Sequence, residues 1–202
     1  MLVAKLYTST ITSSSLRLRE SRIIAGLLLN GVSPEEWKRE IKDNNVLQMG
    51  SPESVNRVSL LLRTRLESLG PGLWQMVRDG DRTLATQAVF AGAVKESRLL
   101  GDFLDITVRE QRLLYAEKLE PLLWNEFIAG CRGRDPEMPH WSDATIQKLR
   151  SAVFSMLAEA GYLKDTRTLQ ISKARRENQA SVSVYHEKML GGKWHVFELH
   201  QV

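Results

Sequence analysis

The densest polar cluster within an otherwise apolar stretch spans residues 95–102 and contains Lys95, Glu96, Ser97, Arg98 and Asp102. If one helix runs through it, Lys95 and Asp102 stand two turns apart on one face, where they can pair. Such a pair suits either a catalytic Lys/Asp site in an open cleft or a buried polar network that fixes helix register. The structural interpretation is the stronger one, because a buried network needs no cleft.

Other signals of chemistry are weak. Cys131 lies beside Arg132 and Arg134, which can lower a thiol pKa, but a lone loop cysteine is more often incidental. The four histidines lack zinc-ligand spacing, and no phosphate-binding loop, dinucleotide fingerprint or nucleophile elbow occurs. We therefore expect no catalytic residue, no cofactor, no metal and no enzymatic activity.

Basic residues form two groups with helix-turn-helix-like spacing, which suits docking on nucleic-acid phosphates. One group flanks the Asn30-Gly31 turn, and the other joins a basic helix to a β-rich tail that resembles a wing. Solvated helix faces or a hairpin tip would show the same pattern. No aromatic residues interleave with the arginines, which favours duplex over single-strand binding. The candidate DNA-binding residues are Arg17, Arg19, Arg22, Lys38, Arg39, Lys42, Lys148, Arg150, Lys164, Arg167, Lys173, Arg175 and Arg176.

The charge distribution agrees with this interpretation. Residues 1–65 carry a net charge of +4, residues 66–141 carry −3 and residues 142–202 carry +3, within a total of +4. Two basic ends favour polyanion binding if they meet on one surface. The acidic middle and the tryptophans equally suit contacts with other proteins.

The hydrophobic periodicity predicts helices over most of the chain. We expect them over about 13–30, 33–43, 51–70, 73–77, 81–100, 103–118, 120–130 and 141–161, with an interruption or restart at Gly101-Asp102. Residues 1–12 suggest an extended entry or a short strand. Residues 168–171, 181–185 and 194–199 suggest short strands, with a helix as the alternative for 181–185. Residues 131–140 read as the longest loop and a domain junction.

The predicted architecture is thus mainly α. We expect a compact multi-helix bundle with a small β-containing C-terminal appendage, divided into a helical core domain (1–140) and a C-terminal region (141–202) packed on the same body. With 43% apolar and 26% charged residues, the chain has the composition of a globular protein. It has one cysteine, no signal peptide and no apolar run near the length of a bilayer span, which predicts a cytoplasmic location.

Several runs of residues resemble the BrxA family, the small helical components of BREX bacteriophage-exclusion systems. The most specific are residues 95–104 (KESRLLGDFL) and 158–163 (AEAGYL), supported by 27–31 (LLLNG), 45–48 (NVLQ), Trp37, Leu73-Trp74 and Trp141-Ser142. The resemblance covers about residues 7–170, and the last thirty residues match less clearly.

That resemblance implies a cytoplasmic phage-defence protein with a helical fold similar to the antitermination factor NusB. It also implies sequence-independent binding of double-stranded DNA and partners among the other BREX proteins, including a methyltransferase, an ATPase and a phosphatase-like component. The leading hypothesis is a non-enzymatic DNA-binding module. The alternative is a scaffold that assembles other BREX components without direct DNA binding.

Overall fold

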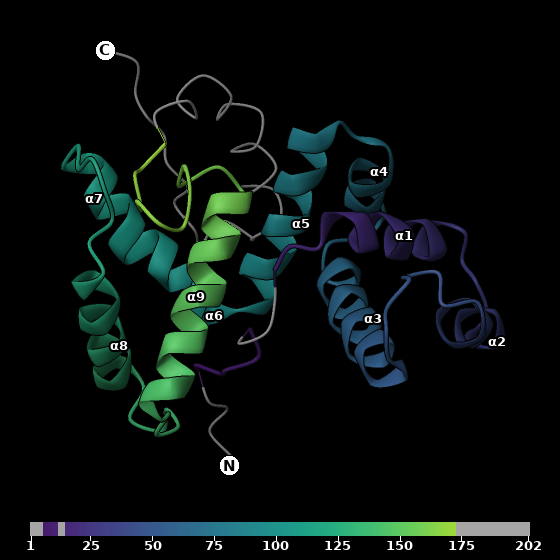
Figure 1. Ribbon diagram of the computed structural model, residues 1–202, viewed down its shortest axis with the longest axis horizontal. Helices are drawn as coiled ribbons and strands as arrows, with labels where there is room; N and C mark the ends of the chain where they lie inside the picture. The colour runs from purple at the N-terminus through teal and green to yellow at the C-terminus, as the bar shows by residue number, and fades with distance from the viewer. Residues whose placement is uncertain (1–5, 12–14, 173–202) are drawn as a thin grey trace. The chain divides into compact units, whose positions relative to one another are not determined.

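The computed structural model describes residues 6–11 and 15–172 (Figure 1). This part of the chain is mainly α-helical and holds two π-helical segments and two isolated antiparallel bridges. The expected strands at 181–185 and 194–199 lie outside the described residues. The helices are α1 (Leu18–Leu29), α2 (Pro34–Lys38), α3 (Pro52–Glu67), α4 (Pro71–Asp79), α5 (Arg82–Glu96), α6 (Arg98–Asp102), α7 (Arg109–Leu113), α8 (Leu122–Arg134) and α9 (Asp143–Glu159), with π-helical η1 (Arg39–Asp43) and η2 (Phe103–Val108).

The chain divides into two compact units at other points than the predicted junction near residue 140. One unit, here called the inserted unit, is Leu16–Glu96. The other, the terminal unit, joins Met1–Ser15 to Ser97–Val202. Residues 131–142 therefore lie within the terminal unit, and α9 belongs to the same body as α8.

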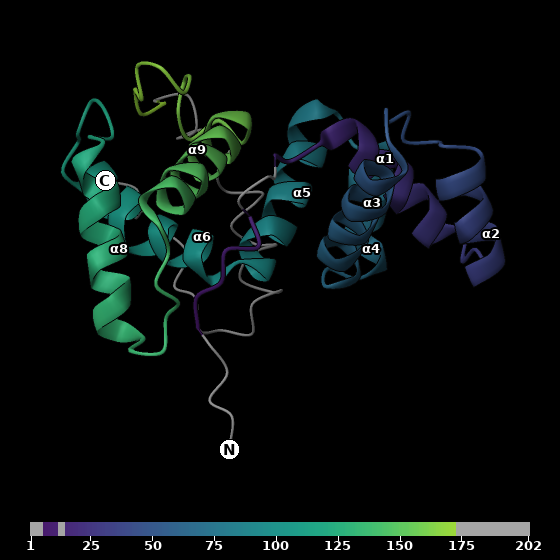
Figure 2. The same cartoon turned by 60° about the horizontal axis from the view of Figure 1, so that its bottom comes forward.

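The inserted unit is built from α1 to α5. Helix α1 packs against α3 and α4, and α5 packs against both of them as well, an arrangement visible in two views (Figures 1 and 2). Buried apolar side chains such as Ile24, Leu62, Val77 and Val89 form its core. Removing such side chains from water is the main force that holds these helices together.

The terminal unit is organised around an aromatic cluster. The ring of Phe103 lies 5.1 Å from that of Trp124 and 5.0 Å from that of Phe127, both edge-on, and 5.9 Å from that of Phe154. These rings come from η2, α8 and α9. Edge-to-face pairs at this separation stabilise a core beyond the area that they bury.

Helix starts with strong local signals are confirmed. The hydroxyls of Ser33, Ser51 and Ser142 each accept a hydrogen bond from the backbone N–H three residues later, as N-caps do. Ser33 and Glu36 form a complete capping box. Asp81 likewise accepts from the N–H of Leu84 at the start of α5.

Four predicted boundaries are wrong. Helix α1 begins at Leu18 rather than near residue 13, because Arg17 adopts a left-handed conformation (φ 48°, ψ 54°). Helix α5 ends at Glu96 rather than near Leu100, and the helix after η2 ends at Leu113. Helix α8 continues to Arg134, so that Cys131 is helical and not in a loop.

Residues 168–171 form no strand. Gln170 and Ile171 instead make single antiparallel bridges to Lys118 and Leu163. None of the described helices combines the length and the apolar character that crossing a bilayer would need.

Candidate nucleic-acid interface

The guanidinium of Arg22 is bound to backbone within the inserted unit. Its two terminal nitrogens donate to the carbonyl oxygens of Arg78 at 2.9 Å and Gly80 at 2.7 Å. These carbonyls lie at the C-terminal end of α4, where unpaired acceptors and the helix dipole favour a cation. Arg22 therefore joins α1 to the end of α4 and is poorly placed to bind phosphate.

Arg17 and Arg19 are also engaged. Arg17 pairs with Glu20 at 3.5 Å and its side chain is only 27% exposed. Arg19 is exposed, but it donates a hydrogen bond to the side-chain oxygen of Gln48. The first predicted group thus contains three arginines with partners inside the unit.

The remaining members of the first group, Lys38, Arg39 and Lys42, are exposed on α2 and η1. Lys38 and Lys42 have no ion pair or hydrogen bond from their side chains to any residue that the structure describes. Arg39 makes one long ion pair, 3.8 Å, with Glu40. Lys42 stands four residues after Lys38 and three after Arg39, spacings at which side chains on a helical segment are neighbours.

The second group lies in the terminal unit. Lys148 is exposed on α9 and has no ion-pair partner in the described part of the chain. The guanidinium of Arg150 lies 5.6 Å from the ring of Phe154, and Lys164 donates to Gln170 at 3.0 Å. Arg167 is exposed. Lys173, Arg175 and Arg176 lie outside the described residues.

Asp165 shapes the turn that carries Arg167. Its carboxylate accepts the backbone N–H groups of Thr168 (2.7 Å) and Arg167 (2.8 Å) and the hydroxyl of Thr168 (2.9 Å). These bonds, the one from the Thr168 backbone first, lower the pKa of Asp165. The acid therefore stays charged and holds the turn while Arg167 remains at the surface.

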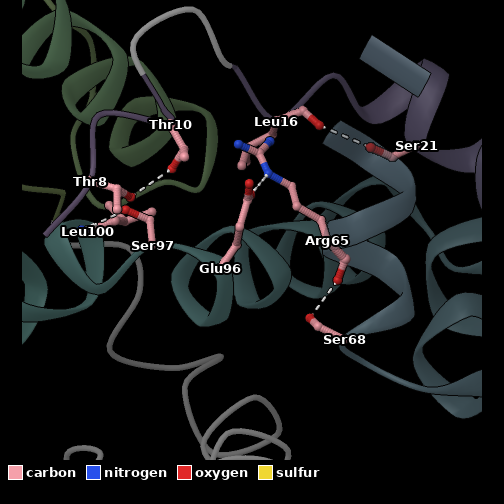
Figure 3. Close-up of polar contacts among 9 residues, drawn as sticks. All are labelled: Thr8, Thr10, Leu16, Ser21, Arg65, Ser68, Glu96, Ser97 and Leu100. Carbon is pink, nitrogen blue, oxygen red and sulfur yellow. Dashed lines mark hydrogen bonds and ion pairs between the residues drawn. The ribbon is translucent and has the colours of Figure 1, made fainter. Parts of the chain in front are cut away.

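The polar cluster at 95–102 does not form the predicted Lys95–Asp102 pair. Ser97 is extended (φ −114°, ψ 102°) and its hydroxyl caps α6 by accepting from the N–H of Leu100, so the helix is broken between the two residues (Figure 3). Lys95 donates to the carbonyl of Ser68, whereas Asp102 pairs with Arg98 at 2.7 Å. Lys95 therefore bonds within the inserted unit, and Asp102 bonds within the terminal unit.

In the inserted unit, Glu96 holds a buried arginine. The Nε of Arg65, whose side chain is 1% exposed, lies 2.5 Å from the carboxylate of Glu96 (Figure 3). Ser68 donates to the carbonyl of Arg65 at 2.7 Å, which fixes the end of α3. A buried cation of this kind requires such a partner.

In the terminal unit, Asp102 is part of a network that sequence reasoning missed. Its carboxylate accepts the hydroxyl of the fully buried Tyr7 at 2.6 Å, and Arg134 donates to the same hydroxyl at 3.0 Å. Asp135 accepts the backbone N–H groups of Leu6 (3.0 Å) and Tyr7 (3.3 Å). No local signal marks these contacts, because they join positions about a hundred residues apart.

The thiol of Cys131 also belongs to this network. Arg134 donates to its Sγ at 3.2 Å, but the thiol is fully buried, and burial raises its pKa to about 11. The lowering of the thiol pKa by neighbouring arginines is therefore outweighed by desolvation. Among the described residues, no group of three His, Cys, Asp or Glu side chains is placed to hold a metal ion.

Comparison with known proteins identifies the family. The BrxA family model matches residues 5–181. The chain belongs to the BrxA family. It is 49% identical over 169 residues to a BREX protein BrxA of Paramagnetospirillum magneticum, covering 84% of this chain and 85% of that one. It is 33% identical over 179 residues to a BREX protein BrxA of Escherichia coli, covering 87% and 84%.

Membership in the BrxA family makes the protein a component of a BREX phage-defence system. A solved structure agrees: the crystal structure of an uncharacterized protein from Magnetospirillum magneticum has a TM-score of 0.76 and 44% identity, covering 89% of this chain and 96% of that one. The sequence resemblance to BrxA and the mainly α fold are thus confirmed.

Proposed function

We propose that the protein is a non-enzymatic BREX component that binds double-stranded DNA without sequence preference. The observation that carries this proposal is the exposed basic group Lys38, Arg39 and Lys42, in which both lysines lack partners in the described part of the chain. Cations at neighbouring positions of a helical segment neutralise phosphates and release counterions. Such contacts set affinity and position without reading bases.

Local structure supports the use of this group. The Ser33–Glu36 capping box fixes the start of α2, and the π-helical η1 continues it. The backbone that carries the three cations is therefore helical throughout. Helix α1, the turn at Asn30-Gly31 and α2 follow the order of a helix-turn-helix element. Gly31 adopts φ 61°, a conformation that favours glycine and permits this tight connection.

A salt titration of duplex binding tests the proposal. The slope of log K against log salt concentration, where K is the association constant for duplex DNA, is negative. The double variant Lys38→Ala/Lys42→Ala is expected to reduce its magnitude by about 2, because each phosphate contact contributes close to one unit. The matched control, Arg78→Ala/Lys118→Ala, removes the same charge from exposed cations that are ion-paired to Asp79 and Glu120. Its slope is expected to stay unchanged. Absent binding at low salt, or binding insensitive to salt, would contradict the proposal.

The terminal unit carries the second basic group, which we propose also binds phosphates. Lys148 and Arg167 are its exposed members in the described part of the chain. Lys173, Arg175 and Arg176 continue it in sequence, in the region expected to resemble a wing. We propose that the fold is a NusB-like helical bundle that carries this C-terminal appendage.

Other BREX proteins are the proposed protein partners, namely the methyltransferase, the ATPase and the phosphatase-like component. The triple variant Lys173→Ala/Arg175→Ala/Arg176→Ala separates DNA binding from assembly. Loss of duplex affinity with intact co-purification of partners supports a direct role on DNA. Loss of co-purification with intact duplex affinity supports the scaffold alternative.

A further inference from the structure

Three consecutive large apolar residues stand exposed at the end of α7. Leu113, Leu114 and Tyr115 are 63%, 67% and 77% exposed, and α7 itself has no buried residue. We call these three residues the α7 patch. Single exposed leucines are ordinary on protein surfaces, but a run of three bulky apolar side chains is typical of a surface that another segment covers.

The chain is directed toward this patch where the described part ends. The N–H of Leu119 donates to the carbonyl of Leu169, and the N–H of Ile171 donates to the carbonyl of Glu117, each at 2.9 Å. Lys118 and Gln170 face one another as an antiparallel bridge between these bonds. In an antiparallel pair the partners run in opposite directions, so the segment that ends at Ser172 runs toward the residues that precede Ala116.

The same short segment is held from its other side. Ile171 bridges Leu163, and the N–H of Ser172 donates to the carbonyl of Tyr162 at 2.9 Å. Residues 170–172 are thus paired with two neighbouring segments, which fixes the direction in which the chain leaves. The α7 patch borders this pairing on the side of Ala116: the N–H of Tyr115 donates to the carbonyl of Arg112, and that of Ala116 to the carbonyl of Gln111, so the patch ends a helix and is not part of the bridge.

The thirty residues that follow, 173–202, have the apolar content to cover the patch. By sequence alone they begin with a basic stretch and then carry large apolar side chains at Val182, Val184, Tyr185, Met189, Leu190, Trp194, Val196, Phe197 and Leu199. Ten extended residues span about 33 Å, so that even the first of these reaches the patch easily.

We propose that the C-terminal tail, residues 173–202, docks on the α7 patch of its own molecule. A tethered segment acts at an effective concentration in the millimolar range, which favours it over a second copy or a separate protein at cellular concentrations. This proposal is independent of DNA binding. It also means that Lys173, Arg175 and Arg176 are held beside the terminal unit and do not trail from it.

Photo-crosslinking in the full chain tests the docking. A benzophenone amino acid replaces Leu114, and crosslinked peptides are identified by mass spectrometry at two protein concentrations. Crosslinks to residues 173–202 of the same molecule, with a yield independent of concentration, are expected. The same probe at Leu122 or Leu60, which are 63% and 66% exposed elsewhere, should not give them. Crosslinks between two molecules that increase with concentration, or the absence of crosslinks to the tail, would overturn the proposal.

Proteolysis of the full chain gives a second readout. The variant Leu113→Glu/Leu114→Glu is expected to speed tryptic cleavage after Lys173, Arg175 and Arg176 by about tenfold or more, because cleavage follows the population of undocked tail. Leu122→Glu, at a residue of matching exposure in the same unit, serves as the control and should leave these rates unchanged. Equal cleavage rates in wild type and the double variant would count against docking.

Discussion

At the scale of residues, arginines that resemble one another in sequence have different roles in the structure. Arg22 reaches two carbonyls at the end of α4, whereas Arg39 stands in solvent beside one acid. The sequence predicts that both arginines lie on helices. It does not say which groups they bind, because the partner of a side chain depends on the helix packed against it. This is why sequence identifies the basic residues but not which of them have partners within the fold.

Arg22 is therefore expected to affect stability more than DNA affinity. Arg22→Ala should lower the free energy of unfolding of the inserted unit by about 1–2 kcal/mol, the contribution of hydrogen bonds from a charged donor. Arg22→Lys should restore little, because an ammonium lacks the planar fork that reaches two carbonyls. Urea denaturation measures this, with Arg82→Ala as control, because Arg82 is exposed on α5 and no described residue forms an ion pair or hydrogen bond with its side chain. Unchanged stability together with a smaller salt slope for duplex binding would show that Arg22 contacts phosphate instead.

Cys131 gives a prediction that depends on pH. Its pKa of about 11, raised by burial, leaves the thiol protonated and unreactive at neutral pH. Alkylation by iodoacetamide should be slow at pH 7 and accelerate as the pH approaches 11, whereas unfolded chain should react readily at lower pH. Rapid alkylation of the folded protein at pH 7 would disprove this description of the thiol.

At the scale of elements, helix starts were predictable and the break inside the polar cluster was not. Ser33, Ser51 and Ser142 are residues of a type that caps helices, and each is followed by a proline or an acid that suits a first helical turn. The sequence pattern stays helical across Ser97 and places an interruption or restart at Gly101-Asp102 instead. The break at Ser97 shows only when its buried hydroxyl is seen to cap α6. The sequence predicts a helix end near residue 130 and a loop from 131, yet α8 continues to Arg134, with Phe127, Ile128 and Cys131 buried along it.

Ser97 should accordingly matter as a cap. Ser97→Ala is expected to destabilise the terminal unit by about 1 kcal/mol, and Ser97→Gly by only a few tenths. The control is Ser151→Ala, an exposed hydroxyl within α9 whose loss should be nearly neutral. Thermal or urea denaturation distinguishes them. Equal stability of Ser97→Ala and wild type would show that α6 starts without help from this side chain.

At the scale of the whole molecule, the mainly α class and the family followed from sequence, but the division into units did not. The terminal unit takes its first strip of chain from residues 6–11, held by Asp102, Arg134 and Asp135. Periodicity describes neighbours along the chain and carries no information about such distant pairs. The predicted junction near residue 140 relied on Gly and Pro content alone.

Tyr7→Phe is expected to weaken the terminal unit by about 1–3 kcal/mol, because it removes a buried hydrogen bond and leaves Asp102 with fewer donors. Burial, and then the bond to Asp102, raise the pKa of Tyr7 above its ordinary value of 10.0. The stabilisation is therefore present below pH 10 and is lost as the pH rises toward the folded-state pKa, since the unfolded chain ionises first. Denaturation of both proteins from pH 7 to 11 measures a difference that should shrink at the alkaline end. A constant difference would exclude this linkage.

The discontinuous build of the terminal unit has a consequence for biosynthesis. The backbone of Tyr7 leaves the ribosome 128 positions ahead of Asp135, the residue that receives its N–H. At about 5–20 residues per second, this strip waits on the order of ten seconds for its acceptors. Leu16–Glu96 emerges complete during that interval, so nascent chains should acquire protease resistance in this middle portion first, with both ends joining last.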